Sequence, residues 1–494
     1  MMNILLIYPE FPDTFWSFKH ALRFIRKKSS SPPLGLITVA AMLPEDWKKR
    51  LVDLNTKALK EKDLEWADMV FISAMVVQKQ SALEILNRCK AAEKPVVAGG
   101  PLFTTGYQEF DSLVDHFVLN EAEITLPLFL KDLKDHKPGH IYATNEFCDL
   151  SETPVPAWEL VEFQHYDSLS IQFSRGCPFN CDFCNITSLL GHRPRLKSSK
   201  QILEELDLMY KLGWRRNIFF VDDNFIGNKS ILKNEILPAL IKWRHGKSGC
   251  QFITEASVNL ADDDELMHMM AQAGFKSVFV GIETPDEESL AECKKYQNKN
   301  RDLIGSVKRM QQAGLQVMGG FIVGFDSDTL SIFERQIEFI QNSGIVTAMV
   351  GLLQAPTGTE LFKRLKGEGR IISGMSGDNA DGSTNIIPKM DVNELMSGYQ
   401  QILAEIYSPH LFYERVTTFL DNYKPVASVV KLHAEEIHAF ILSIWKLGII
   451  GKERKYYWKL FFGTLKNAPE KFPLAITLSI YGYHFRKLVE KMSV

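Results

Sequence analysis

The sequence predicts an α/β protein of three parts: a doubly wound, flavodoxin-like domain over residues 1–135, a partial (β/α)6 barrel over 169–365 and a helical domain over 366–494. Short continuous apolar runs alternate with amphipathic segments, which is typical of parallel βαβ units. This alternation occurs twice, on either side of a proline-containing stretch at 136–168 that we expect to be a linker. Beyond residue 390 the periodicity is helical.

The N-terminal domain contains five candidate strands, at residues 3–8, 50–54, 69–73, 95–98 and 116–119. Open parallel sheets bind ligands beyond the carboxyl ends of their strands. Ser73 ends the third strand, and Gly99 and Gly100 follow the fourth. Glycine lets a bulky ligand approach the backbone closely, although the glycine pair would suit a tight strand-to-helix turn equally well.

The second series contains six candidate strands, at residues 170–173, 217–221, 252–255, 277–280, 317–323 and 348–353. Six strands separated by helices suit a partial barrel, whose active site lies at the carboxyl ends of the strands. A stretch rich in Gly, Ser and Asp, from about 366 to 385, separates this barrel from the helical domain.

Composition excludes several classes of protein. The formal net charge of -3 gives no attraction to nucleic acid, so we expect no nucleic-acid partner. The N-terminal run lacks the basic region and cleavage site of a signal peptide, and no stretch of about 18 apolar residues could span a membrane. Seven cysteines, an odd number, without a secretion signal indicate a reducing compartment, so we expect the protein in the cytoplasm.

The last 70 residues combine eleven Lys and Arg with five Asp and Glu, among many aromatic side chains. Such a mixture can mark a segment that lies on a membrane surface. We favour the simpler interpretation, a helical cap packed on the barrel, and keep peripheral membrane contact as the alternative.

Three cysteines stand out just after the first strand of the barrel. Cys177, Cys181 and Cys184 have the spacing C-x3-C-x2-C. Thiolates hold iron–sulfur clusters, and three of them leave one iron of a cubane open for a substrate or cofactor. Zinc would need a fourth close ligand, for which His192 is the nearest candidate, and a redox disulfide needs only two thiols. The remaining cysteines have apolar or isolated surroundings and are expected to be packing residues: Cys89, Cys148, Cys250 and Cys293.

This motif, with an aromatic residue before its last cysteine, resembles the radical S-adenosylmethionine (SAM) superfamily. The resemblance implies that the three cysteines hold a 4Fe–4S cluster, whose fourth iron chelates the amino and carboxylate groups of SAM. It places Phe183 beside the adenine. The polar residues Asp222, Asp223 and Asn224 follow the second strand, where a carboxylate would accept hydrogen bonds from the ammonium of SAM. The family often has Gly-Gly-Glu here, so which of the three residues does this stays open.

Further positions at strand ends resemble cofactor contacts of the same family. Glu255 ends the third strand, and Gly281 and Glu283 end the fourth; the two glutamates resemble positions that face the ribose or methionine part of SAM. Gly324 lies in a segment that resembles the family's adenine motif after the fifth strand. A solvated loop carboxylate is the alternative for any one acidic residue, but their recurrence at successive strand ends favours a shared site.

A doubly wound domain ahead of a radical SAM barrel resembles the cobalamin-binding subclass. The resemblance implies that Ser73, Gly99 and Gly100 border the nucleotide tail of cobalamin. The D-x-H-x-x-G sequence that supplies a histidine to cobalt in many cobalamin proteins is absent, since neither His20 nor His116 has the Asp and Gly around it. If cobalamin binds, we expect the lower face of cobalt to lack a histidine ligand.

Several strings, among them residues 9–17, 32–39, 219–228 and 320–328, resemble the branch that ends in a helical domain of undefined role and includes the hopanoid C-2 methylase. The branch implies a cobalamin-dependent methyltransferase acting on an unactivated carbon of a small molecule or membrane lipid. It also implies an electron donor such as flavodoxin or ferredoxin. The alternatives are radical C–C bond formation, cyclisation or rearrangement without methyl transfer, and a sensor that binds SAM without turnover.

Overall fold

The computed structural model describes residues 2–378, 380–426 and 434–492. In the N-terminal domain, parallel strands form one sheet in the order β2-β1-β3-β4-β5-β6. These strands are β1 (Asn3–Tyr8), β2 (Lys48–Asp53), β3 (Met69–Ser73), β4 (Val96–Gly99), β5 (His116–Val118) and β6 (Ile141–Tyr142). The first five lie within two residues of the predicted runs.

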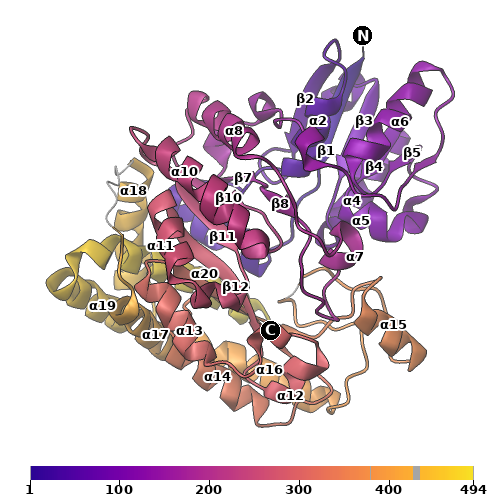
Figure 1. The fold of residues 1–494 in the computed structure, drawn as a ribbon. Helices are drawn as coiled ribbons and strands as arrows, with labels where there is room; N and C mark the ends of the chain where they lie inside the picture. The colour runs from indigo at the N-terminus through magenta and orange to yellow at the C-terminus, as the bar shows by residue number, and fades with distance from the viewer. Residues whose placement is uncertain (1, 379, 427–433, 493–494) are drawn as a thin grey trace.

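Helices cover both faces of this sheet, which confirms the doubly wound fold (Figure 1). Alternate strand residues pack on α2 (Leu34–Met42) and α6 (Ala122–Lys134) on one face. The other residues pack on α3 (Glu61–Trp66), α4 (Lys79–Ala91) and α5 (Pro101–Gly106). The strands are therefore buried on both sides, which explains their continuous apolar sequence.

The segment predicted as a linker takes part in the fold. Its strand β6 pairs with β5 through Phe117 with Ile141 and Val118 with Tyr142. Farther along, Trp158 and Tyr166 are buried in the main core. The prediction of a plain linker is therefore wrong. Strand β6 was missed because two residues are too few to show a periodic pattern.

The central sheet is a partial barrel of six parallel strands in the order β14-β13-β12-β11-β10-β7. They are β7 (Ser168–Ile171), β10 (Asn217–Phe220), β11 (Gln251–Glu255), β12 (Phe275–Glu283), β13 (Gln316–Val323) and β14 (Ala348–Leu352). Helices cover its outer face: α8 (Ser199–Lys211), α10 (Leu237–Arg244), α11 (Asp264–Ala273), α13 (Leu303–Gln312) and α14 (Ile332–Ser343). The six predicted strands are confirmed.

The burial of the barrel strands alternates between the two faces. In β10 and β11, Ile218, Phe220 and Phe252 point outward and are fully buried, whereas Phe219 and Ile253 point inward and keep solvent access. The outward set packs on the helices, because a parallel barrel is closed by its outer helical layer. The inner face of the barrel is thus less completely filled than the outer face.

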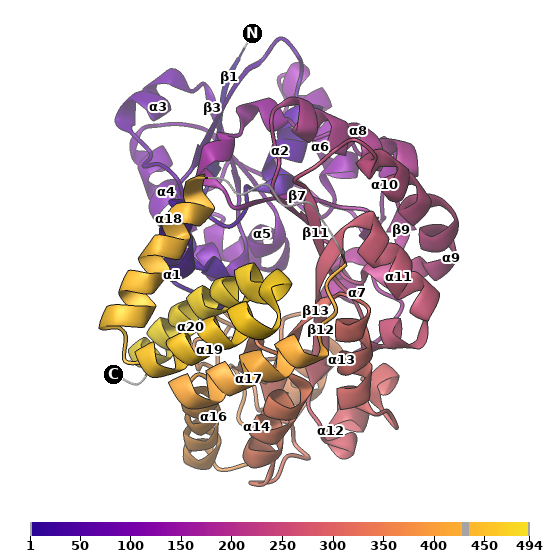
Figure 2. The same cartoon turned by 90° about the vertical axis from the view of Figure 1, so that its left-hand side faces the viewer.

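The C-terminal region is helical, as predicted, and its helices are α16 (Val392–Ile406), α17 (Pro409–Asn422), α18 (Ala434–Ser443), α19 (Arg454–Asn467) and α20 (Phe472–Met492). A π-helical turn (Ile444–Ile450) continues α18. In Figure 2, α17, α19 and α20 lie together on one side of the barrel, and α20 also contacts the N-terminal helix α1 (Lys19–Leu22). One apolar core joins one face of the N-terminal sheet, the barrel and these helices. Among the described helices, none is long and apolar enough to cross a membrane.

Candidate active site

The three motif cysteines lie in a loop that follows the short strand β8 (Ser174–Arg175), which pairs with β9 (Arg195–Leu196). Gly176 begins this loop with φ +95°, and a Cβ there would lie 2.8 Å from the carbonyl oxygen of Gly191. Only glycine therefore fits at this position. The backbone N–H of Cys177 donates to that same carbonyl at 3.3 Å, and the thiols of all three motif cysteines are free and half-buried.

The donor set fits an iron–sulfur cluster better than a single ion. Among the described residues, no three His, Cys, Asp or Glu side chains converge on one metal position. A tetrahedral zinc site requires such convergence, whereas each thiolate of a cubane binds a different iron. Burial raises the pKa of each motif thiol, that of Cys184 to about 12, so iron binding would replace a proton at each sulfur.

Two residues that the sequence did not single out support the sulfur atoms. The amide of Gln297 donates to Sγ of Cys181 at 3.7 Å. The ammonium of Lys295 lies near enough to Cys181 and Cys184 to favour their thiolates electrostatically. Both residues come from the segment after β12, more than a hundred residues from the motif, and no local pattern marks them.

The three candidates after β10 have different surroundings. Asp222 is fully buried and accepts hydrogen bonds from the backbone of Phe173 and from the backbone and hydroxyl of Ser174. The amide oxygen of Asn224 accepts from the backbone N–H of Ser257 at 3.1 Å, so this buried side chain is also engaged within the protein. These contacts give both residues a role in holding the strand ends together.

Asp223 is the one of the three candidates that keeps some solvent access. It is half-buried, and one of its oxygens accepts from the backbone N–H of Gly176 at 3.0 Å, beside the cysteine loop. Burial raises the pKa of Asp223, although that hydrogen bond and the positive charges of Arg175 and Arg195 act to lower it. The half-buried Glu255 lies near Asp223, and burial together with the negative charges of Asp223 and Asp222 raises the pKa of Glu255 to about 8.

Glu283 is held by an ion pair across the end of β12. Its carboxylate lies 2.7 Å from Nζ of Lys295, and its backbone has φ +65°. A Cβ on Gly281 would lie 2.2 Å from this carboxylate and 2.8 Å from the ammonium. A side chain at 281 would therefore displace this ion pair, and the pair links the end of β12 to the surroundings of the cysteines.

Phe183 and Gly324 are brought close together, as expected for one adenine-binding region. The ring of Phe183 packs edge-on against Phe325, the residue after Gly324, at 6.4 Å between centroids. Gly324 has φ +104°, and its N–H donates to Asp328 at 2.8 Å. The positive φ explains the glycine, and the adenine contact stays a prediction.

Ser73, Gly99 and Gly100 also come together, at the carboxyl edge of the N-terminal sheet. Gly100 has φ +88°, and a Cβ there would lie 2.5 Å from the hydroxyl of Ser73. Beside them the side chain of Met75 is exposed. This edge, of small residues and an accessible apolar side chain, fits a broad, flat ligand. His116 begins β5 at the opposite edge of the sheet, and His20 pairs with Asp13 at 3.1 Å and packs against His484 of α20.

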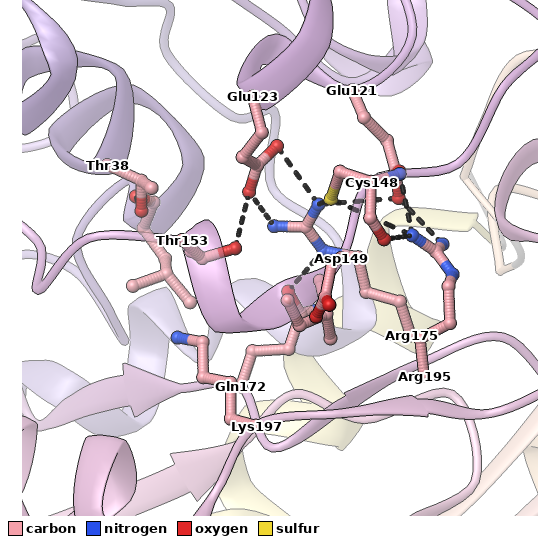
Figure 3. A network of polar contacts seen from close by, with 12 residues as sticks. Thr38, Glu121, Glu123, Cys148, Asp149, Thr153, Gln172, Arg175, Arg195 and Lys197 are labelled. Carbon is pink, nitrogen blue, oxygen red and sulfur yellow. Dashed lines mark hydrogen bonds and ion pairs between the residues drawn. The ribbon is translucent and has the colours of Figure 1, made fainter.

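An ion-pair network joins the N-terminal domain to the cysteine loop (Figure 3). The guanidinium of Arg195 donates two hydrogen bonds to the carboxylate of Glu121, each at 2.7 Å. Arg175 lies 2.7 Å from Glu123 and 3.3 Å from Glu121. The backbone N–H of Cys148 donates to Glu121 at 2.6 Å. Burial raises the pKa of both glutamates, but the arginines outweigh it, so each pKa lies below its ordinary value.

This network has a simple structural consequence. The glutamates follow β5 of the N-terminal sheet, whereas Arg175 lies two residues before Cys177. The carboxyl edge of the sheet and the cysteine loop are therefore tied to each other. The glutamates and the arginines are about fifty or more residues apart in the sequence, so no local pattern pairs them.

Three family models match the chain. The model described as a B12 binding domain matches residues 25–130, and the model of the radical SAM superfamily matches 171–340. A domain of unknown function (DUF4070) matches 359–494.

Two relatives extend over almost the whole chain. An uncharacterized methyltransferase of Synechocystis sp. is 42% identical over 490 residues, which are 98% of this chain and 91% of the relative. The hopanoid C-2 methylase of Rhodopseudomonas palustris is 32% identical over 499 residues, covering 97% of this chain and 93% of that enzyme. The chain belongs to the cobalamin-binding radical SAM enzymes. The solved structure of OxsB, a cobalamin-dependent radical SAM enzyme, shares the fold with a TM-score of 0.64 at 15% identity, covering 100% of this chain and 80% of OxsB.

Family membership confirms the cofactors expected from the sequence. This radical SAM enzyme uses a 4Fe–4S cluster and SAM in its barrel, and its N-terminal domain is a cobalamin domain. The residues that would hold the cluster are Cys177, Cys181 and Cys184, and the small residues at the edge of the N-terminal sheet would border cobalamin.

Proposed function

We propose that this radical SAM enzyme transfers a methyl group to an unactivated carbon of an apolar small molecule or membrane lipid. The observation that carries the proposal is the network of Glu121, Glu123, Arg175 and Arg195, because it holds the cobalamin edge and the cysteine loop against each other. Methyl transfer by both cofactors needs their reactive ends beside one substrate, and this arrangement supports that requirement. The relatives named as methyltransferases support it further.

Each cofactor supplies its own chemistry when bound: the cluster and SAM supply a radical, and cobalamin supplies a methyl group. The chain's own residues orient these groups. We assign the ammonium of SAM to the accessible carboxylate of Asp223, and we assign Glu255 and Glu283 to its ribose or methionine part. Lys295 holds Glu283 in place, and the apolar inner face of the barrel offers an apolar substrate a surface to pack on.

The test is product analysis with anaerobically purified protein carrying its cluster and cobalamin. Incubated with SAM, a reductant and a lipid extract, it should release 5'-deoxyadenosine and increase the mass of a substrate by one methylene unit. The Cys184→Ala variant should lose both activities, while Cys250→Ala, a buried cysteine away from the loop, should keep them. Deoxyadenosine release with a product of unchanged mass would instead support rearrangement or cyclisation.

We further propose that the enzyme works in the cytoplasm at the surface of an anionic membrane and receives electrons from a flavodoxin or ferredoxin. The support for membrane contact is a set of exposed apolar side chains on α18, its π-helical extension and α19: Ile437, Ile441, Trp445, Ile449, Ile450, Phe462 and Leu465. Exposed basic residues accompany it: Lys452, Arg454, Lys455, Lys459 and Lys466. The one acidic residue between 444 and 466, Glu453, is buried against Arg486.

Apolar side chains rimmed by positive charge suit an anionic lipid surface, and they disfavour a second copy of the same basic surface. Sedimentation with vesicles of phosphatidylcholine, with and without phosphatidylglycerol, tests this. Binding should require the anionic lipid and be lost in Ile441→Glu. Ile372→Glu changes an equally exposed isoleucine elsewhere and should have no effect. Equal binding by both variants, or a dimer that Ile441→Glu dissociates, would refute membrane contact.

A further inference from the structure

The segment after β1 carries an aromatic side chain into the barrel. Trp16 lies in a single 3-10 turn (Phe15–Ser17). Its indole N–H points to the sulfur of Met349 at 2.9 Å, and its ring packs edge-on against Phe279 at 5.3 Å between centroids. Met349 lies on β14 and Phe279 on β12, so Trp16 reaches two strands that are not neighbours in the sheet.

Both contacts of Trp16 belong to the inner face of the barrel. Phe279 is the register partner of Glu255, whose neighbours Thr254 and Ala256 are buried while Glu255 keeps solvent access. The accessible inner face is otherwise largely apolar and includes Phe219, Ile253, Phe279, Met318, Ile322 and Met349. Trp16 therefore packs on the residue that pairs with Glu255, a carboxylate of the candidate active site.

The surroundings of Trp16 differ from those of a core tryptophan. Trp214 is 3% exposed and its indole N–H donates to the carbonyl oxygen of Asn217 at 3.0 Å, whereas Trp16 is only partly buried. Buried indoles usually donate to a strong acceptor, but Trp16 meets a thioether, which is a weak one. A side chain held in place on the inner face of the barrel, with part of its surface accessible, is suited to contact a ligand.

The C-terminal helix α20 holds this segment in place. Phe15 stacks on Phe485 at 4.4 Å between centroids, and the imidazole of His484 lies 3.0 Å from the carbonyl oxygen of Phe15. On the other side of Trp16, Phe18 packs against Tyr481, at 5.0 Å. Phe15 and Phe18, which lie on either side of Trp16 in the segment, thus both pack on the helix at the far end of the chain.

We propose that Trp16 forms an apolar wall of the substrate chamber that selects a bulky hydrocarbon, such as a fused-ring lipid. The domain of unknown function then has a definite task, because its helix α20 holds Trp16 in the chamber. The proposal rests on the proposed function only in assuming an apolar acceptor. A flat indole beside Phe279 and Met349 provides a rigid apolar surface, and such surfaces favour large apolar ligands over small polar ones.

Direct binding tests the proposal without requiring turnover. Full-length protein carrying its cluster is incubated with two radiolabelled probes, a pentacyclic hopanoid and the flexible hydrocarbon squalene, and the retained probe is measured. Trp16→Ala should weaken hopanoid binding about tenfold and squalene binding less, because the lost wall contacts the rigid rings. Trp16→Phe should restore part of the affinity. Trp66→Ala, a partly buried tryptophan of the N-terminal domain, should bind like the wild type.

The role of α20 has its own test. Phe485→Ala should reproduce the loss of hopanoid binding, and Phe485→Tyr should rescue it by restoring the stack on Phe15. Iron content and SAM binding of every variant show whether the fold and the cluster loop are intact. Unchanged hopanoid affinity in Trp16→Ala, or no binding of either probe to the wild type, overturns the inference. Probe binding with deoxyadenosine release but no mass gain would refute the proposed methyl transfer alone.

Discussion

The network between the N-terminal domain and the cysteine loop can be tested by removing one charge. The side chain of Glu121 is 4% exposed, and it accepts two hydrogen bonds from Arg195 and one from the backbone of Cys148. Glu121→Gln keeps the shape but leaves Arg195, 18% exposed, without its carboxylate. Breaking a buried ion pair by removing one partner costs about 3 to 5 kcal/mol. Because these groups are not completely buried, we expect the lower end, about 3 kcal/mol.

A surface pair provides the matched control. Glu109 pairs with Lys79, and the two side chains are 60% and 42% exposed. Glu109→Gln should cost at most about 1 kcal/mol, because water screens exposed pairs. Urea unfolding followed by circular dichroism gives both values, and iron analysis shows whether the cysteine loop of Glu121→Gln still holds a cluster. Costs for the two variants within about 0.5 kcal/mol of each other would refute the structural role that we give to the network.

Three further outcomes are expected. Gly176→Ala should abolish iron binding, because the new Cβ would collide with backbone carbonyl oxygens. Gly213→Ala, at a position with φ +98° and open space around it, should keep the iron. Equal iron contents in the two variants would contradict this expectation. Asp223→Asn should weaken SAM binding at least tenfold, because the loss of one charge-assisted hydrogen bond costs about 1.5 kcal/mol. Isothermal titration calorimetry measures this affinity, and a wild-type value would exclude the assigned contact. Burial lowers the pKa of His484 to about 4 from 6.5, so its stabilising contribution is complete above pH 6.5 and is lost as the pH falls toward 4. Unfolding at pH 7 and 5 should show a loss of about 2 kcal/mol that His484→Gln, which can still donate to Phe15, does not show.

Much of the architecture follows from local patterns in the chain. The apolar runs at 69–73 and 217–221 were predicted as strands because short continuous apolar runs between helical segments are typical of parallel sheets covered by helices. The cysteine motif is local as well, since three ligands of one cluster lie within eight residues. The periodicity of apolar residues and the spacing of the cysteines over short stretches are enough to predict such features. The strand β6 was missed because its two residues are too few to form a pattern.

Tertiary contacts determine which polar residues of the site are buried and which stay accessible. Asp222 and Asp223 are neighbours in sequence, yet only the fold buries one against Ser174 and leaves the other accessible beside Gly176. The partners of Glu121, Lys295 and Trp16 likewise come from distant segments, and α20 reaches Phe15 across almost the whole chain. An ion pair or a ring contact depends on where two separate elements pack. The sequence around one partner therefore does not indicate which residue the other partner is. The residue types and strand ends can therefore be predicted from the sequence, whereas the pairing of these residues required the three-dimensional structure.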